Sequence, residues 1–369
     1  MRANRNREAG LKRKWMVGLV LAVAAMGAMA VLLQRQIGAE LYSRAVTARV
    51  GGDATAGLPD GLHLVLCGTG SPLPDRNRAG PCAAIIAGRQ IYIVDAGEGS
   101  SRTLAMAQLP IGRVNGLFLT HFHSDHFDGL GPLMLLRWTQ ATATAPLPVH
   151  GPDGVTAIID GLNAAYVTDN GYRVAHHGPA IVPPTGAGAT AMPFAIPPAD
   201  GSSVTVLSSG GLVVTAFRVN HGPVSPAVGY RFSYKGRSVV ISGDSAATPA
   251  MARNAAGADI LLHDALEPML LDNITNGLAA HGEANTAQIT RDIVNYHATP
   301  TDAARAAQAA GVRHLVLTHL VPVLPSSYFY PAFLGDAATH FSGPITVGED
   351  GMIFTMPANS TAITQGRLP

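Results

Sequence analysis

The chain has 369 residues, 47% of them hydrophobic and 13% charged, which is enough to bury one large core or two modest ones. Its net charge is +1, and residues 1–14 carry +5 of it, so residues 15–369 sum to −4. Proteins that bind nucleic acids usually need a concentrated positive face, and this charge balance argues against large polyanionic partners.

The N-terminus has the pattern of a membrane anchor. Residues 15–33 carry no charge, and nineteen residues just span a hydrocarbon core of roughly 30 Å. Because basic flanks stay in the cytoplasm, the sequence predicts a cytoplasmic tail at 1–14 and a transmembrane signal anchor at 15–33 in the inner membrane. The part of the chain that follows the anchor would then be periplasmic or extracellular. A cleavable signal peptide is the alternative, to which the small residues Ala28 and Ala30 are suited.

Residues 34–57 are predicted to form a stalk and linker, and residues 58–369 the folded domain. In this domain, short apolar runs alternate with turn signals, which is typical of β-strands. The predicted strands lie at 63–67, 83–87, 91–94, 117–120, 213–219, 228–234, 238–242, 260–263 and 315–318.

Helices are expected between the strands, and the clearest begins at Pro300-Thr301, with the threonine as N-cap, and ends at Gly311. Residues 179–203 are rich in Pro, Ala, Gly and Thr, which predicts an exposed loop or lid. Two strand-rich halves with helices outside predict an α/β fold, a four-layer αββα sandwich, preceded by one transmembrane helix.

The chain has only two cysteines, Cys67 and Cys82, too few for a thiolate metal site or a disulfide framework. They would be able to pair in an oxidising compartment. Two separate small buried residues are the alternative, and the sequence favours it at least as much as a pair.

The strongest chemical signal is the segment His121-Phe122-His123-Ser124-Asp125-His126, which directly follows an apolar run. Three imidazoles and one carboxylate within six positions cannot all face one metal ion, but they can divide between two ions. His121 and His123 would serve one, and Asp125 and His126 the other. Imidazole and carboxylate groups suit zinc and related metals, and no cysteine is required.

The His-x-His-x-Asp-His pattern resembles the signature of the metallo-β-lactamase superfamily, and the chain from about residue 62 to 320 resembles its ribonuclease Z branch. The resemblance implies that Asp95, in Val-Asp-Ala-Gly-Glu, orients a metal-binding histidine. It further implies that His221, Asp244 and His319 complete two zinc shells, with Asp244 bridging. Manganese or iron would be alternatives to zinc. The implied metal ligands are His121, His123, Asp125, His126, His221, Asp244 and His319.

His297 matches the family position of a histidine that assists the leaving group, a role that suits imidazole because its usual pKa is near neutrality. Ala298 stands where the family usually has a serine. His263 and Asp264 resemble a family His-Glu pair, and we expect them to support His297 or the metal shell. The shorter Asp side chain reduces the reach of that pair.

The resemblance implies hydrolysis by a water shared between two zinc ions, with His297, Asp125 and Asp244 as the catalytic residues. Bacterial ribonuclease Z holds RNA with an arm inserted after a Gly-Tyr-Arg strand. Here Tyr230 leads through Lys235-Gly236 directly into Val239, so only a tight turn is expected.

We therefore expect a phosphodiesterase or related hydrolase of small-molecule esters. Nucleic acid is a less favoured substrate. A ribonuclease Z that processes tRNA 3′ ends is the first alternative, and a lactonase or a non-catalytic zinc-binding membrane protein is the second. A homodimer is expected by analogy with the family. Arg76, His176 and His177 are expected at most to contact substrate, and His281 is expected in a surface loop.

Overall fold

The computed structural model describes residues 2–141 and 143–369 and divides the chain into two compact units, Met1–Gly52 and Asp53–Pro369. Residue 1, the first of the predicted basic tail, lies outside the described residues, as do residue 142 and the side chains of residues 2–6, 8 and 9. The first unit contains helix α1 (Arg2–Arg49), which includes residues 34–49 of the predicted stalk. Its segment Gly10–Arg49 is long and apolar enough to cross a membrane. A signal sequence can have the same length and composition.

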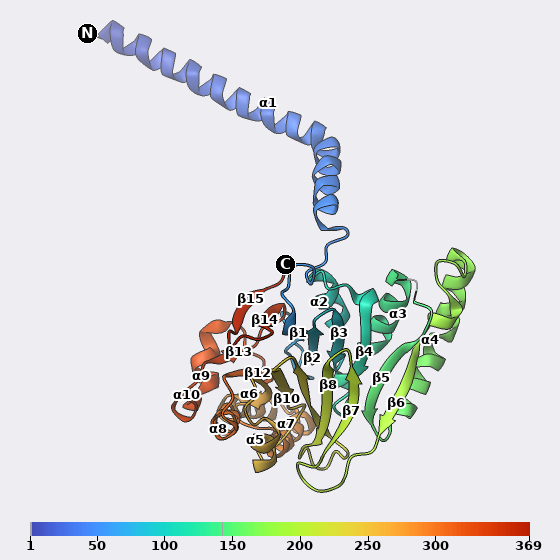
Figure 1. The fold of residues 1–369 in the computed structure, drawn as a ribbon. Helices are drawn as coiled ribbons and strands as arrows, with labels where there is room; N and C mark the ends of the chain where they lie inside the picture. The colour runs from blue at the N-terminus through green and yellow to red at the C-terminus, as the bar shows by residue number, and fades with distance from the viewer. Residues whose placement is uncertain (1, 142) are drawn as a thin grey trace. The chain divides into compact units, whose positions relative to one another are not determined.

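The second unit contains two β-sheets (Figure 1). The first has eight strands in the order β15-β14-β1-β2-β3-β4-β5-β6. Their bounds are β1 Gly61–Gly68, β2 Cys82–Ala87, β3 Gln90–Val94, β4 Val114–Phe118, β5 Leu147–Pro152, β6 Ala189–Phe194, β14 Met352–Pro357 and β15 Thr364–Arg367. The second sheet has seven strands in the order β13-β12-β11-β10-β9-β8-β7. Their bounds are β7 Ser203–Ser209, β8 Leu212–Arg218, β9 Val228–Tyr234, β10 Arg237–Ile241, β11 Ile260–Leu266, β12 His314–Val321 and β13 Ile345–Val347.

Helices cover the outer face of each sheet, which gives the four layers that the sequence predicted. The longest, α4 (Val155–His177), packs against β5 and β6. The other α-helices of this unit are α2 Ser100–Met106, α3 Leu130–Ala141, α5 Pro249–Asn254, α6 Pro268–Ala280, α7 Ala284–Asp292, α8 Pro300–Ala310, α9 Tyr330–Leu334 and α10 Ala337–His340. Short 3₁₀ turns occur between them, of which Ser124–His126 and Ile293–Tyr296 form parts of the site.

The three largest apolar clusters of the described residues follow from this layering. Val65, Ile93 and Leu133 belong to the cluster between the first sheet and its helices. The inner faces of the two sheets meet in a second cluster, and Ala303 and Ala307 of α8 belong to the third, behind the second sheet. The alternating side chains of central strands such as β1 and β11 therefore fill two cores, which explains why these strands read as nearly continuous apolar runs.

The structure corrects several details of the predicted elements. Residues 189–194, within the predicted loop or lid at 179–203, form the edge strand β6, which pairs in parallel with β5. Helix α8 is capped by Thr299 and not by Thr301, because Pro300 occupies the first helical position, where its missing N–H costs nothing. The Thr299 and Asp302 side chains form a capping box, and Gly311 ends the helix with a φ of 65°, as predicted.

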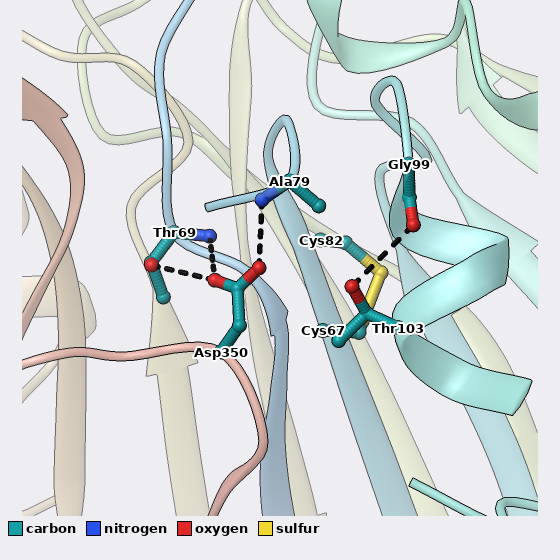
Figure 2. The surroundings of a disulfide bond; sticks show 7 residues. All are labelled: Cys67, Thr69, Ala79, Cys82, Gly99, Thr103 and Asp350. Carbon is teal, nitrogen blue, oxygen red and sulfur yellow. Dashed lines mark hydrogen bonds between the residues drawn. A yellow bond between two sulfur atoms is a disulfide. The ribbon is translucent and has the colours of Figure 1, made fainter. Parts of the chain in front are cut away.

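Cys67 and Cys82 form a disulfide at the base of the β1–β2 loop (Figure 2). Asp350 fastens both ends of the same loop. Its Oδ1 accepts hydrogen bonds from the Thr69 backbone N–H (2.9 Å) and from Thr69 Oγ1 (2.7 Å), and its Oδ2 accepts from the Ala79 N–H (2.6 Å). The Thr69 carbonyl in turn accepts from the N–H of Leu320, the neighbour of His319. This loop is therefore fixed beside the strand end that carries His319.

The expected tight turn also replaces any arm between β9 and β10. Tyr234 pairs directly with Arg237, and Lys235 and Gly236 both have positive φ values, of 44° and 78°. Two residues with positive φ form the hairpin turn whose twist matches that of the flanking strands.

Candidate metal centre

Buried strand ends from both sheets deliver polar side chains to one place. Asp95 follows β3, the segment from His121 to His126 follows β4, and Asp244 follows β10. His221 follows β8, and His319 lies within β12. Every one of the seven predicted metal ligands is brought into this cluster, in two groups whose ligand atoms lie within 4.8 Å of one another inside each group. The first group is His121, His123, His221 and Asp244, and the second is Asp125, His126 and His319.

Asp244 lies between the two groups. Its Oδ2 is 3.8 Å from the Nε2 atoms of both His121 and His221. The same oxygen is 3.3 Å from the Nε2 atoms of both His126 and His319. Among the described residues, Asp244 is the one carboxylate that lies within 4.0 Å of histidines in both groups, as a bridging ligand would.

The backbone at two of these positions adopts a conformation that side chains rarely tolerate. Asp95 and His319 have φ values of 57° and 48°, in the left-handed region. His319 is also the residue at which the β11–β12 register shifts, between the pairs Asp264–Thr318 and Ala265–Leu320. Such a bulge turns a side chain out of its regular alternation, and this local strain is typical of functional sites.

Hydrogen bonds fix the orientation of two imidazoles. Asp95 Oδ2 lies 2.9 Å from His126 Nδ1 and also accepts from Thr120 Oγ1 (2.8 Å), while Asp95 Oδ1 accepts from the Thr120 N–H (2.9 Å). His221 Nδ1 lies 3.0 Å from the carbonyl oxygen of Tyr296. When each Nδ1 carries the proton and donates it, each Nε2 presents a lone pair to the centre of the cluster.

Without a cation, the cluster has an uneven charge distribution. Burial and the neighbouring imidazoles lower the pKa of His121 well below its usual value, and burial lowers the pKa of His123 and of His221. Burial also opposes protonation of His126, but the Asp244 and Asp95 carboxylates raise its pKa well above the usual value. The first group therefore offers neutral imidazoles, the form that binds metals.

His319 behaves like His126. Burial opposes its protonation, but Asp244 and Asp125 raise its pKa. Burial also opposes ionisation of Asp244, yet the charges of His319 and His126 hold its pKa well below the usual value. The carboxylates that raise the pKa values of His126 and His319 are therefore ones whose charge a bound cation would also balance.

The donor set fits divalent cations. His126 Nε2 is buried, and no residue in the described part of the chain hydrogen-bonds it. His121 Nε2 and His123 Nδ1 face each other at 3.0 Å, where two ring nitrogens can share at most one proton. A cation among these atoms would accept the lone pairs of His126 Nε2 and of the facing nitrogens of His121 and His123. Imidazole with carboxylate is a ligand set typical of zinc.

A second network holds His297. Its Nδ1 lies 2.9 Å from Asp264 Oδ2, and Asp264 Oδ1 lies 2.9 Å from His263 Nδ1. Asp264 therefore reaches both histidines despite being shorter than glutamate. Burial opposes its ionisation, but the hydrogen bonds from His263 and His297 lower its pKa. The His297 ring stacks on His319 with centroids 5.3 Å apart, next to the second ligand group.

A cleft of about 460 Å³ opens beside Asp125. The β1–β2 loop forms one wall with residues 71–76, and Glu98 and Asp128 line it as well. Arg76 is exposed there, whereas Arg78 lies 3.8 Å from Asp75. Burial and the Asp125 and Glu98 carboxylates raise the pKa of Asp128. The cleft thus combines two arginines with several carboxylates and does not form a uniformly basic surface.

The remaining sequence candidates lie elsewhere. His176 and His177 occupy the exposed last turn of α4, and His281 caps the exposed C-terminus of α6. Sequence reasoning missed Tyr296, whose carbonyl faces His221, and Asp350, which holds the loop. Tyr296 was marked only by its adjacency to His297, and no motif pointed to Asp350.

Comparison with known proteins agrees with this geometry. Residues 91–320 match the model of the beta-lactamase superfamily domain, a range that includes every predicted metal ligand and catalytic residue. The chain therefore belongs to the metallo-β-lactamase superfamily of hydrolases, whose fold implies a divalent metal.

Within this superfamily, the sequence relatives of the chain belong to the ribonuclease Z branch. The ribonuclease Z of Mycobacterium marinum is 33% identical over 291 residues, which cover 78% of this chain and 96% of the relative. That of Mycolicibacterium gilvum is 35% identical over 294 residues, which cover 78% and 94%.

Solved structures show the same fold at lower identity. The metallo-β-lactamase fold protein YhfI of Bacillus subtilis has a TM-score of 0.58 and 18% identity, covering 80% of this chain and 99% of that protein. The short form of human tRNase Z has a TM-score of 0.56 and 22% identity, with coverage of 80% and 99%.

Proposed function

We propose that this chain is a phosphodiesterase that uses two divalent cations, zinc or alternatively manganese or iron. The carrying observation is the position of Asp244 Oδ2, 3.3 to 3.8 Å from the Nε2 atoms of four histidines in two groups. One cation would be held by His121, His123, His221 and Asp244, and the other by Asp125, His126, Asp244 and His319. Bound cations of this kind polarise a phosphoryl oxygen and lower the pKa of water toward neutrality.

The protein's own residues supply orientation and proton transfer. Asp95 and the Tyr296 carbonyl keep His126 and His221 in the tautomer with Nε2 free. Asp264 accepts the Nδ1–H of His297, and when the ring is protonated at both nitrogens its Nε2–H would pass to the departing oxygen, leaving the neutral imidazole. His263 Nδ1 bonds to the backbone carbonyl of Asp264 (2.9 Å) and lies 2.9 Å from the other carboxylate oxygen, so it helps to position Asp264.

Hydrolysis of bis(p-nitrophenyl) phosphate by the purified full-length protein in detergent tests the proposal. Asp244→Ala should abolish turnover, whereas Asp160→Ala, at an exposed position on α4, should not change it. Two bound metal ions without turnover of any phosphodiester, sulfate ester or lactone would favour a non-catalytic zinc-binding protein. Preferred turnover of lactones would make the chain a lactonase.

A second candidate function is the cleavage of RNA. The names of the curated relatives support a ribonuclease Z activity on tRNA precursors more directly than they support small esters. The two-residue β9–β10 turn and the carboxylates of the cleft favour small substrates. Cleavage of a precursor tRNA should be compared with that of small diesters at moderate salt, and efficient cleavage at the 3′ end would decide for RNA.

We further propose that residues 15–33 anchor the protein in the inner membrane, with residues 1–14 cytoplasmic, residues 34–57 as stalk and linker, and the hydrolase domain from residue 58 exported. The apolar length of α1 and the Cys67–Cys82 disulfide support this topology, because disulfides persist in oxidising compartments. An alkaline phosphatase reporter fused after Pro369 should be active. A reporter that works only in the cytoplasm would contradict export.

A further inference from the structure

Tyr296 adjoins the cluster but belongs to neither ligand group. It ends the 3₁₀ turn Ile293–Tyr296, which connects α7 to His297. Its carbonyl oxygen lies 3.0 Å from His221 Nδ1, so the backbone that carries the phenol ring is tied to one of the proposed metal ligands. The backbone at Tyr296 is thus held by the same hydrogen bond that orients His221.

The Tyr296 ring contacts two imidazoles of the site. It meets the His221 ring edge to face, with centroids 4.9 Å apart and an interplanar angle of 87°. It lies 5.1 Å from the His297 ring. Whereas His221 is only 1% exposed, Tyr296 is half-buried, so its ring borders both the proposed metal ligand and the proposed proton donor while remaining in contact with solvent.

The Tyr296 hydroxyl has no hydrogen-bond partner among the residues that the structure describes. By contrast, the half-buried Tyr330 donates to Glu349 Oε1 at 2.8 Å, and the buried Tyr230 donates to the Leu119 carbonyl at 2.6 Å. Burial and the carboxylates of Asp244, Asp292 and Asp125 raise the pKa of Tyr296. Two of these carboxylates belong to the proposed metal ligands, so the phenol lies within the electrostatic reach of the centre.

We propose that the Tyr296 hydroxyl donates a hydrogen bond to a phosphoryl oxygen of the substrate and so helps to select phosphate esters. This inference rests on the proposed phosphodiesterase function. A neutral O–H donor facing an anionic phosphoryl group forms a charge-assisted hydrogen bond, which is stronger than one between neutral groups. The role differs from packing, because packing requires the ring but not the hydroxyl.

The Tyr296→Phe variant isolates the hydroxyl, and Tyr296→Ala also removes the ring. Tyr172→Phe, at a position 70% exposed on α4, is the matched control. We expect Tyr296→Phe to lower kcat/KM for bis(p-nitrophenyl) phosphate and to weaken the binding of inorganic phosphate, each about 10-fold or more. The bound metal should be unchanged, and Tyr172→Phe should match the unmodified protein.

The inference would be overturned if Tyr296→Phe equalled the unmodified protein in both kcat/KM and phosphate affinity. It would also be overturned if only Tyr296→Ala lowered these two quantities, or if Tyr296→Phe lost bound metal. If the unmodified protein hydrolyses no phosphodiester, the proposed function fails. Titration calorimetry of metal-loaded protein with inorganic phosphate would still decide the role of Tyr296, because it measures binding without turnover. Equal phosphate affinity in the two proteins would then exclude the hydrogen bond.

Discussion

Reduction of the Cys67–Cys82 disulfide should destabilise the domain without removing any side-chain atoms. The two residues are 15 positions apart. Loop-closure entropy for a loop of that size corresponds to about 3 kcal/mol at 25 °C. The compact unit spans residues 53–369, and unfolding entropy scales with length, so this loss should lower the Tm by about 4 to 5 °C.

The assay compares protein refolded under oxidising conditions with protein refolded in reductant, each followed by thermal unfolding. Reduction after unfolding is required because the two cysteines are only 1% and 5% exposed in the folded domain. Activity at 25 °C should largely persist, since Asp350 still fastens the loop through Thr69 and Ala79. Equal Tm values for the two forms, with the disulfide verified by thiol counting, would refute the loop-closure reasoning.

The other predictions concern the site. His297→Ala and Asp264→Asn should each lower kcat about 100-fold or more while the bound metal is retained, and simultaneous loss of metal would contradict a role in proton transfer. Asp95→Ala should weaken metal binding about 10- to 100-fold in chelator competition, because His126 loses its acceptor at Nδ1, and an unchanged affinity would contradict that role. Metal affinity should rise with pH from about 6.5 upward, because the pKa values of His126 and His319 are raised and both must lose protons to bind. Because their pKa values are raised by folding, His126 and His319 also contribute to the free energy of unfolding of the metal-free protein. That contribution should be complete below about pH 6.5 and should be lost as the pH rises through their folded-state pKa values. Calorimetry in buffers of different ionisation enthalpy should detect the released protons, and affinity that does not depend on pH would contradict the assignment.

The sequence predicted the strands that position the site because those strands are buried on both faces. β1 and β11 are buried at every residue and are apolar except for His63 in β1 and for His263 and Asp264 in β11. β6 has one fully buried residue and lies at a sheet edge, so its composition resembled that of a loop. Helix α4 was not predicted at all, because it contains Gly161 and Gly171 and buries few residues.

For the site, the local cluster from His121 to His126 was recognisable by its spacing alone. His221, Asp244 and His319 required the family resemblance, because each is isolated in the sequence. The pairing of Cys67 with Cys82 depended on the register of β1 against β2, which places Gly68 opposite Cys82. Tyr296 acts on His221 through a backbone carbonyl, and side-chain patterns carry no signal for such a contact.

The central claim is that seven side chains hold two divalent cations around Asp244. Metal analysis by mass spectrometry of the purified full-length protein, beside Asp244→Ala and the Asp160→Ala control, tests it most directly. We predict close to two ions per chain in the unmodified and control proteins and fewer in Asp244→Ala. A folded protein that binds no divalent metal, or an Asp244→Ala variant that keeps both ions, would contradict the account.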